Sequence, residues 1–273
     1  MISYSKYGYI DELRKKRKGR KVRFAFLVIF LLITLAVFLI YALLFSGWFS
    51  VNQIQVSGNR EVSKEEIESL ASEHINKTYL LGYIRPFSNI FLTSSESIEH
   101  SLRKNYPIIE RVNVNKVFLS KNLTIEITER ESVGIWCKGD EDKCFYFDKN
   151  ALLFKEASKF SGDLFLVIED GRGRNFKPGD NFDDQELFEK INLTRNILDE
   201  LKLIDYTNFF LPSGSFDFWI ETNFGWPIYL DKENDIPTQL VALKKFLEEK
   251  LSAEKQKTLQ YIDLRVNNRI YYK

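Results

Sequence analysis

The hydrophobic and polar positions of the chain fall into three stretches with different patterns. The first is FAFLVIFLLITLAVFLIYALLF, residues 24–45, which carries no charged residue. A helix of this length can cross a hydrocarbon core of roughly 30 Å at about 1.5 Å per residue. A cleaved signal peptide has a shorter apolar region and a small-x-small cleavage site, and this stretch has neither feature. The pattern therefore predicts a retained transmembrane helix over residues 24–45.

The second stretch, residues 50–130, alternates between the periods of strands and helices. Residues 51–57 read as a strand. Ser63 and Glu66 then form the capping box of a helix, and a further helix is expected from about residue 95 to residue 105. Two alternating segments, ERVNVNKVF and NLTIEITER, predict two more strands. The predicted order β-α-α-β-β forms a small α+β domain with two helices on one face of a three-stranded sheet.

The third stretch, residues 131–273, is mostly strand-like. The segments SVGIW, CFYFD, ALLFKEA, LFLVIE, SFDFWIE and PIYLD are candidate strands. One helix is expected after Asp183 or Asp184, and a last one near Pro237. The final segment, YIDLRVNNRIYYK, reads as a strand, a polar turn and a short aromatic end. This stretch therefore predicts a mainly antiparallel β domain with two helices.

Charge is balanced over the whole chain but not at its start. The formal net charge is +1, from 39 basic and 38 acidic residues, which does not favour nucleic-acid binding by the protein as a whole. The run RKKRKGRKVR, residues 14–23, directly precedes the apolar stretch. Positive residues beside a membrane span stay in the cytoplasm. We therefore expect a cytoplasmic tail at residues 1–23 and an exported part at residues 50–273.

The two cysteines, Cys137 and Cys144, flank a polar segment that resembles a hairpin tip. Opposed positions on a hairpin can come within disulfide distance, and an exported domain lies in an oxidising compartment. We predict a disulfide between them. A zinc site would need further ligands nearby, and the segment Asp140–Asp142 lacks the spacing of a calcium loop, so no metal or cofactor is expected.

The sequence offers little that would support catalysis. A sortase-like transpeptidase needs a cysteine thiolate beside a histidine, but His74 and His100 lie in the predicted second stretch, away from both cysteines. The segment GRGRN, residues 171–175, is too short for a phosphate-binding loop, and no nucleophile elbow or HExxH pair occurs. We therefore expect a binding protein that is not an enzyme and has no small-molecule substrate.

Several segments together resemble the FtsQ/DivIB family of bacterial cell-division proteins. FSVNQIQVSGNREVSKEEIESLA resembles the start of a POTRA domain, and TIEITERESVGIW resembles the passage from that domain into the family's β domain. FYFDKNALLF resembles the family's "D-x-x-G" hairpin, with Asn150 taken to stand at the glycine position, and YIDLRVNNRIYY resembles its C-terminal "IDLR" strand. The resemblance implies a division at residue 130 between a POTRA domain (50–130) and an FtsQ-type β domain (131–273).

The resemblance also implies a function and a docking site. A family member is expected at the division septum in the plasma (inner) membrane, where it holds FtsB- and FtsL-like bitopic proteins and connects other divisome proteins to septal wall synthesis. The expected mechanism is strand addition at the C-terminal edge. The residues expected to bind the partner are Arg265, Val266, Asn267, Asn268, Ile270 and Tyr271. Two other functions stay open, namely a general membrane-anchored POTRA adaptor in secretion or envelope assembly and an anchored sortase-like transpeptidase.

Overall fold

The computed structural model describes residues 4–45, 47–76, 88–139, 143–158, 166–182, 184–214 and 217–273. Its contacts divide the chain into two compact units. Unit 1 comprises Met1–Ser101 with Asn113–Glu126, and unit 2 comprises Leu102–Val112 with Ile127–Lys273. The strand prediction at residues 164–165 and the alternative helix cap at Asp183 lie outside the described residues.

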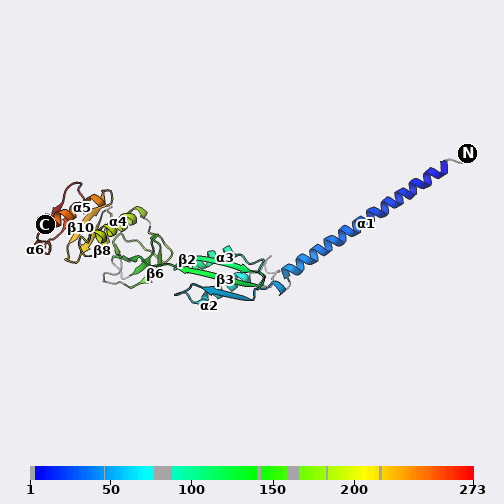
Figure 1. Ribbon diagram of the computed structural model, residues 1–273, viewed down its shortest axis with the longest axis horizontal. Helices are drawn as coiled ribbons and strands as arrows, with labels where there is room; N and C mark the ends of the chain where they lie inside the picture. Colours follow the sequence, from blue (N-terminus) through cyan, green and yellow to red (C-terminus); the bar gives the residue numbers. More distant parts are fainter. Residues whose placement is uncertain are drawn as a thin grey trace. The chain divides into compact units, whose positions relative to one another are not determined.

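A single long helix, α1 (Tyr4–Phe45), opens unit 1 and is drawn in blue in Figure 1. It contains Val22–Leu43, the one segment of the described chain that is long and apolar enough to cross a membrane. This agrees with the predicted span of residues 24–45 and suits a single-pass membrane protein. The helix begins well before the apolar segment, which the sequence pattern did not indicate. A short 3₁₀ turn, η1 (Gly47–Phe49), follows it.

The next elements have the predicted order of strand, helix, helix, strand, strand (Figure 1). They are β1 (Gln53–Ser57), α2 (Lys64–Ile75), α3 (Ser95–Asn105), β2 (Ile109–Val117) and β3 (Asn122–Glu129). The three strands form a sheet in the order β1-β3-β2, in which β1 runs parallel to β3. The alternation of β3 buries Leu123 and Ile125, and Ile67 of α2 and Ile98 of α3 are fully buried.

The capping chemistry of this region matches the prediction. The Ser63 hydroxyl accepts a hydrogen bond from the backbone N–H of Glu66, and the Glu66 carboxylate accepts one from the backbone N–H of Ser63. These bonds satisfy donors that have no partner within a helix, so they fix the start of α2. The hydrogen bonds from Ser63 also lower the pKa of Glu66.

Unit 2 is built on a nine-stranded mixed sheet in the order β12-β11-β10-β9-β8-β7-β4-β5-β6. Five of the eight neighbouring pairs are antiparallel, while β4–β7, β7–β8 and β10–β11 are parallel. The strands are β4 (Gly134–Lys138), β5 (Cys144–Phe147), β6 (Leu153–Ala157), β7 (Leu166–Asp170), β8 (Tyr206–Leu211), β9 (Asp217–Thr222), β10 (Pro227–Asp231), β11 (Ile262–Asp263) and β12 (Tyr271–Tyr272). The expectation of an α+β fold with a mainly antiparallel sheet is confirmed.

Two helices supply the other side of the core of unit 2. They are α4 (Gln185–Leu201), capped by Asp184, and α5 (Ile236–Lys250), with a proline in its first turn. Alternate residues of β8, β9 and β10, such as Phe209, Ile220 and Ile228, share one hydrophobic cluster with Ile191 of α4 and Leu240 of α5. Both helices therefore cover the same face of the sheet. A short helix, α6 (Ala253–Gln256), is additional to the two expected.

Two details of unit 2 differ from the sequence predictions. Strand β8 was missed because its apolar residues are adjacent rather than alternating. In the structure, Phe209 faces the core and Phe210 stacks on Trp219 on the other side of the sheet. In the hairpin FYFDKNALLF, the residue with left-handed backbone is Ala151 (φ 61°), not Asn150. Counting "D-x-x-G" from Asp148 places the fourth residue at Ala151, so the assignment of the glycine position to Asn150 was wrong.

Candidate docking edge

Strand β12 forms one edge of the nine-stranded sheet. It pairs antiparallel with β11, with Ile262 opposite Tyr272 and Asp263 opposite Tyr271. Within the described part of the chain, β12 has no strand on its other side. An edge strand presents N–H and C=O groups that an extended peptide can pair with.

The backbone bonds around β12 show which residue faces outward. The N–H of Lys273 donates to the carbonyl of Tyr261 (3.3 Å), and the carbonyl of Lys273 accepts from Gln260 (2.6 Å). Lys273 therefore points its polar groups toward the neighbouring strand. Along an antiparallel strand these groups alternate in direction, so the N–H and C=O of Tyr272 point away from β11. Tyr272 is the residue whose backbone is available for strand addition.

The structure distributes the six predicted docking residues over a turn and a strand. Val266, Asn267 and Asn268 lie in the turn between β11 and β12, where Asn268 has a φ of 61°. Ile270 is partly buried against the core of unit 2. Tyr271 is on the edge strand itself and is 44% exposed.

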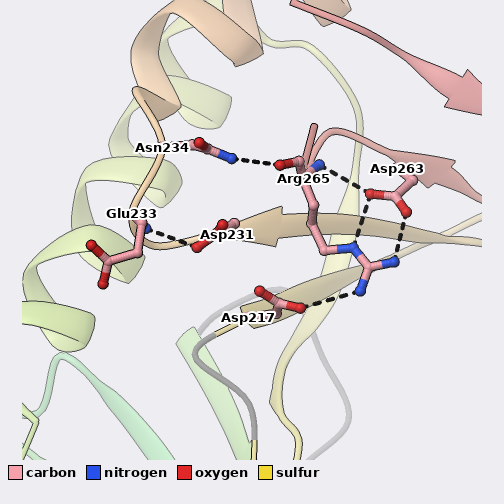
Figure 2. A network of polar contacts seen from close by, with 6 residues as sticks. All are labelled: Asp217, Asp231, Glu233, Asn234, Asp263 and Arg265. Atoms are coloured by element: carbon pink, nitrogen blue, oxygen red, sulfur yellow. Dashed lines mark hydrogen bonds and ion pairs between the residues drawn. The ribbon is translucent and has the colours of Figure 1, made fainter. Parts of the chain in front are cut away.

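Arg265 does not extend freely into solvent. Its Nε and Nη2 atoms donate to the Asp263 carboxylate at 2.9 and 2.6 Å, and its Nη1 donates to Asp217 at 3.2 Å (Figure 2). The guanidinium also lies over the Tyr229 ring, 5.1 Å from its centroid. The side chain remains 41% exposed. Arg265 is therefore oriented by its own unit and still reachable by a partner carboxylate.

Hydrogen bonds from Arg265 lower the pKa of the Asp263 carboxyl, and the same bonds raise the pKa of Arg265. Both groups are therefore charged at neutral pH. Because the Arg265 side chain is 41% exposed, solvent screens the pair, and its contribution to folding stability is small, about 0–1 kcal/mol. Its main effect is to hold the guanidinium in one orientation beside the edge.

Two side chains from another part of unit 2 hold the backbone after β11. The amide of Asn234 donates to the carbonyl of Arg265 (2.7 Å), as Figure 2 shows, and the amide of Gln239 donates to the carbonyl of Leu264 (2.5 Å). Sequence reasoning missed these residues and Asp217. They lie 25–48 residues before their partners, and nothing in the local pattern distinguishes them from ordinary polar positions.

The cysteines lie directly opposite each other on β4 and β5, and the structure joins them in a disulfide. Both are almost fully buried, with Ile135 and Val167, on the face of the sheet opposite to the main core. His74 and His100 belong to unit 1. Among the described residues, no group of three or more His, Cys, Asp or Glu side chains could hold a metal ion.

Two comparisons with known proteins show what this chain is similar to. Residues 49–130 match the family model for a POTRA domain of the FtsQ type. Over 169 residues, or 62% of the chain, it is 30% identical to the cell division protein DivIB of Clostridium botulinum, in the Loch Maree strain and in the Hall strain alike. The chain is thus similar to the FtsQ/DivIB family of cell-division proteins. The aligned region spans 57% of the length of these curated relatives. The residues that match the POTRA model contain the β-α-α-β-β elements of the structure.

Proposed function

We propose that this protein is a membrane-anchored scaffold of the bacterial division machinery, of the FtsQ/DivIB type. It captures FtsB- and FtsL-like bitopic proteins by strand addition at β12 and links early and late division proteins to septal wall synthesis. The observation that carries this proposal is the edge position of β12, whose residue Tyr272 directs its backbone N–H and C=O away from β11. The match to DivIB division proteins supports the cellular process.

The site for the partner includes more than the strand. Tyr272 packs against Phe246 of α5, with ring centroids 5.0 Å apart, which holds the edge strand on the core. Arg265 offers a charge-assisted hydrogen bond to a partner carboxylate. Val266 and Tyr271 add exposed apolar surface, at 45% and 44% exposure. An extended segment with an acidic residue fits this combination of groups.

The proposed topology follows from the charge pattern. The basic residues just before Val22–Leu43 favour a cytoplasmic N-terminus, so the two-domain region after the span lies outside the plasma membrane. In that oxidising compartment the Cys137–Cys144 disulfide is stable. The domain boundary remains a proposal, with a POTRA domain to residue 130 and a β domain from residue 131.

The two alternative functions make different demands on the structure. A sortase-like transpeptidase would need a thiolate, and the structure bonds both cysteines to each other and leaves none free. A general POTRA adaptor would need the same membrane anchor but would not depend on cell division. The similarity to DivIB favours the scaffold over the adaptor.

The location of the protein in dividing cells tests this function. A fluorescent fusion of the full chain should form a band at midcell, and its depletion should produce filamentous cells. Uniform membrane fluorescence, in cells that divide normally after depletion, would overturn the division function and favour the adaptor. Rescue of division in depleted cells by a Cys137→Ser/Cys144→Ser variant that still folds tests the transpeptidase alternative, since a scaffold needs no reactive thiol and a cysteine transpeptidase does.

A further inference from the structure

An exposed apolar patch lies at one end of the β-α-α-β-β region of unit 1. Within the described residues of that unit after α1, every exposed large hydrophobic side chain belongs to this patch. Its members are Trp48, Phe91, Val117, Phe118 and Leu119, of which Trp48 is 82% and Leu119 100% exposed. Single exposed hydrophobic residues are ordinary on a protein surface, whereas a group of them gathered at one end indicates a contact surface.

The topology of the three-stranded sheet places this patch beside the end of the apolar helix. Strand β1 runs parallel to β3, with Gln53 opposite Asn122, so both strands begin at the same end of the sheet. The chain enters β1 shortly after α1 and η1, and it enters β3 directly from the turn at residues 118–121. The tip of the β2–β3 hairpin therefore lies at the end of the sheet that the chain reaches from α1.

Several contacts hold the patch together. The ring of Phe91 stacks on that of Phe118, with centroids 5.2 Å apart, and Phe49 lies edge-on to Phe91 at 5.2 Å. The backbone N–H of Asn52 donates to the carbonyl of Lys121 at 2.8 Å. The hairpin tip is therefore fixed to the segment that follows α1, and the patch is formed before any partner is present.

One side-chain hydrogen bond joins this end of the sheet to the apolar helix itself. The amide of Asn89 donates to the carbonyl of Leu43 at 2.8 Å, and Leu43 is the last residue of the apolar segment Val22–Leu43. Carbonyl groups in the last turn of a helix have no partner within it, so the bond satisfies one of them. Phe49 follows Leu43 by six residues, and a chain extends by at most about 3.6 Å per residue, so the patch begins within roughly 22 Å of the end of the span.

The residues around the hairpin tip have the character of a segment at a membrane surface. Lys116 and Lys121 flank the sequence Val-Phe-Leu-Ser, and no acidic residue lies between them. Lysine side chains keep their apolar stems on hydrocarbon and their ammonium groups among the lipid headgroups. Tryptophan and other aromatic rings also favour that interface. A bilayer therefore matches both the apolar tip and its basic flanks.

We propose that this patch dips into the phospholipid headgroup region of the leaflet that the C-terminal end of the span reaches. The hairpin tip at residues 117–121 supplies the inserted apolar side chains, and Trp48 and Phe91 complete the contact. The protein then touches the membrane at two places, the span and the hairpin, which sets the height and the orientation of the β-α-α-β-β region above the bilayer. This contact depends on the membrane span alone and not on the proposed division function.

The test is fluorescence of the full chain in nanodiscs of phosphatidylcholine and phosphatidylglycerol, with an environment-sensitive dye on an introduced cysteine. Both native cysteines are in a disulfide, so the dye reacts with the introduced thiol alone. Leu119→Cys places the dye at the hairpin tip, where the fully exposed side chain has no role in folding. Ser57→Cys is the matched control, because Ser57 is exposed and lies opposite Glu126, roughly 13 Å along β3 from Asn122.

The dye at position 119 should emit at shorter wavelength than the dye at position 57. A spin label near the glycerol end of the lipid chains should quench it at least about twofold more strongly, since interfacial segments insert about 5–10 Å into the headgroup and acyl boundary. Equal quenching at the two positions would overturn the proposal. So would a dye at position 119 that stays in water in these nanodiscs and shifts only after FtsB- and FtsL-like proteins are added, because the patch would then be a docking site for a protein.

Discussion

Replacing Asp148 with alanine should destabilise unit 2 by about 3 kcal/mol, because this side chain is a buried ion-pair partner and the cap of a turn. Its carboxylate accepts from the Nη1 of Arg130 at 2.5 Å and from the backbone N–H groups of Asn150 and Leu152 at 2.9 and 3.0 Å. The Asp148 side chain is 4% exposed and that of Arg130 is 14% exposed.

The magnitude follows from what the substitution leaves behind. Removing one member of a buried ion pair costs about 3–5 kcal/mol, because the other charge stays buried without its partner. Arg130 is not completely buried, and its Nε also donates to the carbonyl of Pro107 at 2.9 Å. The destabilisation expected for Asp148→Ala therefore lies at the lower end of that range. Asp148→Asn keeps an acceptor for the two turn N–H groups but loses the charge. It should therefore cost less, about 1.5–3 kcal/mol.

Urea unfolding of the full chain in detergent, followed by tryptophan fluorescence, measures this effect. A loss of about 3 kcal/mol corresponds to a midpoint lower by about 1–3 M urea. Lys149→Ala is the matched control, because Lys149 is the neighbouring residue and its side chain is 70% exposed, with a surface ion pair to Glu110. The control should change stability by about 1 kcal/mol or less. An Asp148→Ala protein as stable as the Lys149→Ala protein would refute the reasoning.

Three further predictions concern unit 2. Non-reducing peptide mapping of protein from its native compartment should show Cys137 linked to Cys144, and two alkylatable thiols would contradict this. The free energy of unfolding of the double Cys→Ser variant should be lower by about 2.5 kcal/mol. Because the pKa of Asp263 is lowered by Arg265, their interaction stabilises the fold above the ordinary pKa of Asp and is lost as the pH falls through the lowered value. The urea midpoints of wild type and Asp263→Asn should therefore converge on going from pH 7 to pH 3, and a constant difference would count against the pair. Ala151→Gly should leave the free energy of unfolding unchanged or raise it by up to about 1 kcal/mol, since glycine adopts a φ of 61° without strain. A decrease of more than about 1 kcal/mol would show that the packing of the buried Ala151 methyl group outweighs the backbone strain.

The sequence was sufficient for those parts of the fold that depend on local chemistry. The capping box of Ser63 and Glu66 fixed the start of α2, and the alternation at Leu123 and Ile125 identified one buried face of β3. The uncharged segment before Phe45 identified the apolar helix. In each case the deciding residues lie within a few positions of one another.

The parts that sequence reasoning missed depend on distant contacts. Arg265 was expected to face a partner or solvent. In the structure its guanidinium donates hydrogen bonds to Asp263 and also to Asp217, which lies 48 residues earlier in the chain. This changes the choice of variant for the docking edge. Arg265→Glu, the obvious choice from sequence, would place a third carboxylate beside two others and disturb the fold. Arg265→Gln removes the charge without adding repulsion and is the better test of partner recognition.

The measurement that tests the central claim most directly is co-purification of the FtsB-like partner with two variants of the edge strand. Tyr272→Pro removes the outward N–H but leaves the β11–β12 bonds, while Tyr272→Ala removes the same ring and keeps that N–H. With strand addition, Tyr272→Pro should capture the partner at least about tenfold less well than Tyr272→Ala, with both proteins folded. Equal capture by the two variants would contradict docking through the backbone of β12.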